Sequence, residues 1–196
     1  MMEMRRRALM GAAQEELAPG IYKVQSIRTY GTHYVDLNII GYFKFVVDAQ
    51  IVSTKYGCFC GRYGGASSRF AMRKTGSTWG FALGSSSEYV EIGAADTERH
   101  VFTLDPFKKI CSVDDIQATI DRVWGSNSRH AYFGAYRSST IENPADVIGF
   151  GITVYNDDGT IRHDFLPAIN AVSKKEGLWH IDNNSGSAYF TALTAI

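Results

Sequence analysis

The chain has few of the residues that mark specialised classes of protein. It holds four prolines and three cysteines in 196 residues, and the cysteines, Cys58, Cys60 and Cys111, are odd in number and irregularly spaced. This pattern argues against a disulfide framework. No second Cys or His pair accompanies Cys58 and Cys60, so no zinc site is expected. We expect both to be small core residues on one face of a strand, and we predict no cofactor.

Neither sign of charge dominates, and no long apolar run is present. The 20 basic and 20 acidic residues give a formal net charge of zero, which offers no field to attract nucleic acid or an anionic membrane. It also favours self-association. No stretch approaches the ~20 apolar residues of a membrane span, and residues 1–13 lack the apolar core of a signal peptide. We expect a chain made in a cytoplasm that stays soluble or is released by lysis.

Glycine and aromatic residues are abundant, and they punctuate short alternating segments. The clearest example is a hairpin in which residues 149–155 and 160–166 flank Asn156-Asp-Asp-Gly159. Asp-Gly favours a two-residue turn, and Pro167 is expected to end the second strand. Other expected strands cover residues 22–27, 31–36, 42–52, 57–61, 68–73, 79–83, 89–92, 99–104, 109–113 and 131–136.

About eleven to thirteen short strands at roughly 10-residue spacing are typical of an antiparallel β-sandwich or barrel. We predict an all-β sandwich as one domain over residues 21–196. A short helix is also suggested for residues 114–123, where Ile116, Ile120 and Val123 recur at helical spacing.

We expect residues 1–20 to form a separate N-terminal arm. Good helix formers fill residues 1–18 and Pro19-Gly20 follows them, which predicts a helix that stops there. Arg5, Arg6, Arg7 and Leu9 are candidates for contacts with a partner subunit. The alternative is that the arginines are simply a solvated helix face.

One predicted sheet face carries residue types suited to binding a carbohydrate. Arg69 and Arg73 share strand parity, with Ala71 between them, so they present two guanidinium groups on one face. Aromatic partners for a sugar ring are Trp79, Tyr63 and Tyr136, and Arg137 is a further donor. The alternative is an ordinary solvated face, which every antiparallel sandwich has.

Metal and catalytic residues are not predicted. Asp157-Asp158 and Asp182-Asn183-Asn184 are oxygen-rich, but turn formation explains both without calcium. Glu88 and Glu91 are three residues apart and face opposite sides of a strand.

An ordered set of segments resembles the concanavalin A-like jelly-roll domain of the LamG and pentraxin type, found in phage structural proteins and gut-bacterial surface proteins. The segments are Ile27–Asp36, Phe59–Arg62 with Arg69–Met72, His100–Leu104, Ala131–Ala135, Ile152–Tyr155, Arg162–Pro167 and Gly177–Asp182, ending near Tyr189-Phe190. The resemblance implies a jelly roll related to lectins and to certain glucanases. The glucanases carry paired acids on one strand, and this chain lacks that run.

The resemblance therefore favours a non-catalytic phage virion structural protein, of the decoration or fibre-tip type. Such a protein is made in the host cytoplasm and displays a lectin-like domain on the virion surface for adhesion to glycans. The arm would join copies of the chain, or other virion proteins, into an oligomer. The alternatives are a bacterial carbohydrate-binding module and, less favoured, a glycoside hydrolase.

Overall fold

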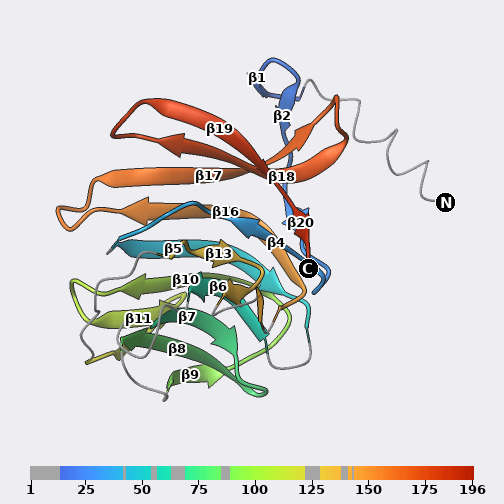
Figure 1. The fold of residues 1–196 in the computed structure, drawn as a ribbon. Coiled ribbons are helices and arrows are strands. Elements are labelled where there is room, and N and C mark those ends of the chain that lie inside the picture. Colours follow the sequence, from blue (N-terminus) through green and yellow to red (C-terminus); the bar gives the residue numbers. More distant parts are fainter. Residues whose placement is uncertain are drawn as a thin grey trace.

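The computed structural model shows a sandwich of two antiparallel sheets (Figure 1). It describes residues 14–41, 43–53, 57–62, 69–84, 89–121, 129–137, 141–142 and 144–196. This confirms the prediction of an all-β sandwich.

The larger sheet has eleven strands, and its main path runs β1-β2-β17-β16-β5-β10-β11-β12. In addition, β3 pairs with β16, β18 with β17, and β19 with β18. The strands are β1 (Glu16–Ala18), β2 (Ile21–Lys23), β3 (Ile27–Arg28), β5 (Lys44–Ile51), β10 (Arg99–Asp105), β11 (Ile110–Val113), β12 (Ile116–Thr119), β16 (Val147–Tyr155), β17 (Ile161–Asn170), β18 (Lys175–Asp182) and β19 (Ser187–Ala192).

The smaller sheet has seven strands in the order β20-β4-β13-β6-β7-β8-β9, and β14 and β15 form a separate pair. These strands are β4 (His33–Asp36), β6 (Gly57–Arg62), β7 (Arg69–Lys74), β8 (Thr78–Gly84), β9 (Val90–Ala94), β13 (Tyr132–Phe133), β14 (Tyr136–Arg137), β15 (Ile141–Glu142) and β20 (Thr194–Ala195).

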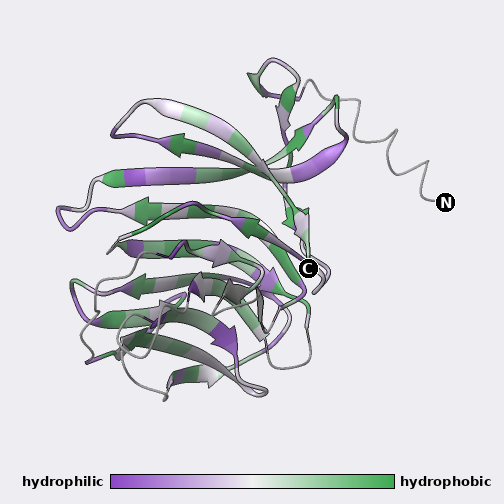
Figure 2. Ribbon diagram, viewed as in Figure 1, coloured by the Kyte–Doolittle hydropathy of each residue, from purple (hydrophilic) through white to green (hydrophobic). Residues whose placement is uncertain are grey.

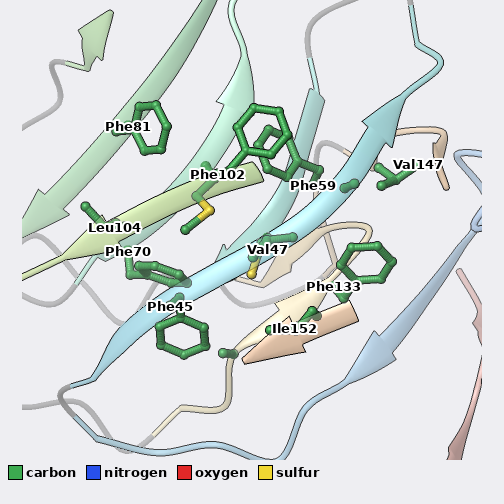
Figure 3. Packing of buried hydrophobic residues seen from close by; sticks show 14 of the residues in the cluster. Phe45, Val47, Phe59, Phe70, Phe81, Phe102, Leu104, Phe133, Val147 and Ile152 are labelled. Atoms are coloured by element: carbon green, nitrogen blue, oxygen red, sulfur yellow. The ribbon is translucent and has the colours of Figure 1, made fainter. Parts of the chain in front are cut away.

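The core lies between the two sheets because each long strand alternates buried and half-exposed residues. In β5, Phe45, Val47, Ala49 and Ile51 are fully buried while the residues between them are not. Figure 2 shows the same alternation of apolar and polar residues along the strands. Aromatic rings from both sheets meet in this core (Figure 3), where the Phe59 and Phe102 centroids are 4.5 Å apart.

Neither predicted helix is present in the described part of the chain. Ile110–Val113 and Ile116–Thr119 form a β-hairpin, with Asp114 in the turn at a φ of 48°. The helical spacing of Ile116 and Ile120 was misleading, since antiparallel pairing of Ile116–Thr119 with β11 organises this segment instead. At the N-terminus, Glu16–Ala18 pairs with β2 as a strand, and residues 1–13 lie outside the described residues.

The predicted hairpin of β16 and β17 is confirmed, but its turn differs from the prediction. Asn156 N donates to Thr160 O at 2.9 Å, and only Gly159 has a positive φ, of 83°. The loop is therefore one residue longer than the two-residue turn that Asp-Gly suggested. Pro167 does not end β17, which continues to Asn170. The Pro167 carbonyl accepts a hydrogen bond from Val24 N.

A β-bulge separates the two neighbouring cysteines of β6. Cys58 is opposite Arg73 and Cys60 is opposite Met72, so Phe59 is the extra residue. Cys60 joins the main core, whereas Cys58 packs with Ala71 and Ala82 on the other face. Both thiols are buried as expected, but the prediction that they share a face is wrong.

Candidate functional site

The structure brings Arg69 and Arg73 together on the outer face of the smaller sheet, around Tyr89. Arg69 Nη2 donates to Tyr89 Oη, and its guanidinium lies 4.4 Å from the ring centroid. Arg73 lies over the same ring. Tyr89 immediately precedes β9 and was not singled out from the sequence. Tyr89 lies two residues before Glu91, in a segment where polar and apolar residues alternate. This spacing was the sequence signal that the two side chains share the outer face.

One predicted member of that face, Trp79, is not brought to it. Trp79 is only 2% exposed and packs against Phe59 and Phe102 in the core. It shares strand parity with Phe81 and Leu83, which are also buried, so the expectation that it faces solvent is wrong. The backbones of Tyr136 and Arg137 form β14, which pairs with β15.

Tyr63 lies outside the described residues, as do Arg5, Arg6, Arg7 and Leu9 of the arm.

A second face, on the outside of the larger sheet, carries a continuous row of side chains. Strand register sets Val101 opposite Asp48, Asp48 opposite Gly151, Leu166 opposite Trp179 and Trp179 opposite Phe190. The pairing of Ile152 with Phe165 then sets Gly151 beside Leu166. Directly opposite residues share a face, so one row crosses six strands: Val101, Asp48, Gly151, Leu166, Trp179 and Phe190.

Gly151 leaves an opening in the middle of this row. A bulge at Phe150 shifts the register of β16 against β5, so Gly149 faces the core and Gly151 faces outward. A Cβ on Gly149 would lie 2.6 Å from Phe133, whereas a Cβ on Gly151 would meet only Phe165 O at 3.7 Å. A glycine inside a strand often marks the close approach of a ligand or another backbone.

On one side of the opening lies the ion pair of Arg99 and Asp48. Arg99 donates from Nε and Nη2 to the two carboxylate oxygens of Asp48, at 2.8 and 2.6 Å. The hydrogen bond from this guanidinium to Asp48 raises the pKa of Arg99. Arg99 also lies 3.9 Å above the ring centroid of Phe150. Three contacts thus hold one guanidinium beside Gly151.

The other side is an apolar wall built by Trp179. Its neighbours in β18, Leu178 and His180, are buried in the core, so Trp179 points to the outer face and is half-buried there between Leu166 and Phe190. Asp48 and Leu166 flank Gly151 at two strand spacings, which makes the opening roughly 10 Å wide, and Trp179 lies one strand beyond Leu166. We name it the Gly151 groove, with Asp48, Arg99, Phe150, Leu166 and Trp179 as its lining.

The loops considered for calcium are occupied by turn hydrogen bonds. Asp158 Oδ1 accepts from Thr160 Oγ1 at 2.6 Å and from Thr160 N at 2.9 Å, and these two hydrogen bonds lower the pKa of Asp158. Asp182 Oδ1 accepts from Asn184 N at 3.0 Å. Within the described residues no group of three His, Cys, Asp or Glu side chains is arranged to hold a metal ion.

No family model matches the sequence, and no curated protein sequence matches it either. Within the described part of the chain there is no helix that could cross a membrane. The class that the fold itself defines is the antiparallel β-sandwich.

Proposed function

We propose that this protein is a non-catalytic, lectin-like sandwich that binds glycans through the Gly151 groove and serves adhesion as a phage virion structural protein. The observation that carries the glycan proposal is the missing side chain at Gly151, with the Arg99 guanidinium held on one side and Leu166 followed by the half-exposed Trp179 on the other. An aromatic body with nearby polar groups suits a sugar, which has apolar ring faces and hydroxyl edges.

The groove residues lie on the outer face of a sheet, so a single contact would be weak. Adhesion becomes effective when many copies act together, because avidity multiplies weak contacts without adding new ones. Display of many copies on a particle supplies that condition.

The spacing of the carboxylates near the groove supports a non-catalytic role. Asp48 and Asp164 both face outward, two strands apart and one side-chain row apart. Strand geometry separates them by about 12 Å, whereas glycosidases hold their two acids about 5–9.5 Å apart. Asp48 is also committed to Arg99.

The jelly-roll identity and the virion setting are part of the same proposal, and they are supported by the segments that resemble concanavalin A-like domains. Attachment through residues 1–20 is the proposed route onto a particle. Co-purification of the chain with phage particles would support this setting, and a chain found only in bacterial cells would favour the carbohydrate-binding module.

A glycan array probed with multivalently displayed protein tests the binding proposal. We expect at least one class of glycan to bind, and Trp179→Ala to weaken that binding about tenfold or more. Tyr89→Ala, on the face of Arg69 and Arg73, is the matched control. If Tyr89→Ala abolishes binding and Trp179→Ala does not, the glycan site lies on the smaller sheet and the groove assignment is wrong.

A further inference from the structure

Strand β19 lies at the margin of the larger sheet, beside β18 (Figure 1). Leu193 N donates to Glu176 O at 2.9 Å, which makes these two residues a hydrogen-bonded pair. Hydrogen-bonded pairs alternate along an antiparallel ladder, so Thr191 and Tyr189 also direct their backbone groups toward β18. The backbone groups of Ala188, Phe190 and Ala192 therefore point outward, and no described strand pairs with them.

The sequence of this margin has none of the features that protect sheet edges, although β4 packs beside its C-terminal end. Charged residues, proline and bulges normally block edge-to-edge pairing, yet residues 187–196 contain no charged residue and no proline. The other edge strands do carry protective features. β1 has three residues, a glutamate and a register shift, and β9 contains Glu91 and a glycine with a φ of 56°. β12 packs beside β9 of the smaller sheet.

We infer that β19 pairs with β19 of a second copy of this chain, antiparallel, around a two-fold axis at Phe190. In that register Phe190 pairs with Phe190 of the second copy, and Ala188 of each chain pairs with Ala192 of the other. All three outward N–H groups and all three outward carbonyls of each strand then find partners. A self-complementary strand of this kind is what an isologous interface requires.

The side chains agree with the same register. Phe190 belongs to the outward row with Trp179 and Leu166, so the two-fold axis would join two apolar rows end to end. No like charges meet across the axis, because the strand carries none. Two small alanine pairs flank the central phenylalanines, which leaves room for both rings.

The pairing would also place two Gly151 grooves on one face of a continuous sheet, about 34 Å apart along the strand-stacking direction. This consequence rests on the proposed function, whereas the pairing itself does not. A glycan surface would then engage both grooves of the dimer.

Sedimentation velocity of the full chain over a range of concentrations tests the pairing. We expect a dimer that Phe190→Lys and Ala192→Pro each weaken at least tenfold. Ala192→Pro removes only an outward N–H, so the ladder with β18 remains intact. Gln117→Lys on β12 adds the same charge at the far margin and should leave the dimer unchanged. A wild-type monomer at all concentrations, or a dimer that survives both β19 substitutions, overturns the inference.

Cross-linking provides a readout that does not depend on those variants folding. Paired Phe190 residues have their Cα atoms about 5.5 Å apart, within the range of a disulfide. We expect Phe190→Cys to form a covalent dimer on mild oxidation, while Val101→Cys, exposed on β10, does not. The native thiols are buried and should not interfere. Equal cross-linking of the two variants would contradict the proposed register.

Discussion

His180 Nε2 lies 2.9 Å from His163 Nδ1, in a buried pair on the core side of β17 and β18. Phe165 stacks on the His180 ring at a centroid distance of 4.4 Å. Burial, and then the neighbouring His163, lower the pKa of His180 to about 4, and burial also lowers the pKa of His163. Both rings are therefore neutral in the folded protein at neutral pH.

This pair predicts loss of stability in acid. Because the folded state lowers the pKa of His180, its contribution is complete above the unfolded value of about 6.5 and is lost as the pH falls toward 4, by up to about 3 kcal/mol. His180→Phe keeps the stack on Phe165 and should reduce that loss. Urea unfolding at pH 7 and pH 4.5 measures the loss of unfolding free energy. An equal loss in wild type and variant would contradict the assignment of that loss to His180.

His100 should behave in the opposite way. Its Nδ1 lies 2.6 Å from Asp114 Oδ2 and its Nε2 lies 2.8 Å from Asp96 Oδ1. Burial alone would lower the pKa of His100, but these hydrogen bonds outweigh it and raise the pKa. The resulting stability is present below about pH 6.5 and is lost as the pH rises through the folded pKa.

An NMR titration of the His100 ring tests this prediction. The pKa should lie above the ordinary value in the wild type and fall in Asp114→Asn. Asparagine tolerates the left-handed backbone of residue 114, so the turn is retained and only the charge is removed. A His100 pKa that Asp114→Asn leaves unchanged would show that the carboxylate does not act on the ring.

Gly177 is predicted to be the least replaceable glycine of the β17–β19 region. A Cβ there would overlap the carbonyl oxygen of Thr191 and lie 2.8 Å from Ala192 Cα, and neither backbone atom can move aside cheaply. Gly177→Ala should cost about 3 kcal/mol or more. Gly186→Ala, where the φ is 69° and no atom lies within 4 Å, should cost only about 1 kcal/mol. Thermal unfolding compares the two, and equal costs would contradict the packing.

The cysteines should be unreactive in the folded protein. Burial raises the pKa of Cys58 and of Cys111 to about 12, and raises that of Cys60 as well. Thiolates are the reactive species, so a thiol reagent at pH 8 should modify none of the three until denaturant is added. Rapid modification of one thiol without denaturant would place it in a more open environment.

Strand positions were the predictable part of this fold, because alternation is visible in the sequence itself. The segment from Lys44 to Ile51 and the hairpin after Val147 follow directly from it. Trp79 was misplaced even though its parity with Phe81 and Leu83 was available. The segment after Asp114 was misread because three isoleucine and valine positions fit a helical period, while pairing with β11 decided the outcome.

The Gly151 groove was not predictable, for a physical reason. It depends on which strands lie side by side, since Asp48, Gly151 and Trp179 come from β5, β16 and β18. It also depends on the bulge at Phe150, which turns Gly151 outward. Periodicity shows which residues share a face of one strand, but it does not show lateral order or the position of bulges.

Titration of an array-selected glycan into Gly151→Val by calorimetry tests the central claim most directly. Valine suits a strand and, with only Phe165 O near its Cβ, it should fill the groove floor without disturbing the core. We predict that binding is lost while the unfolding temperature stays close to that of the wild type. Binding of Gly151→Val with wild-type affinity would contradict the proposed site.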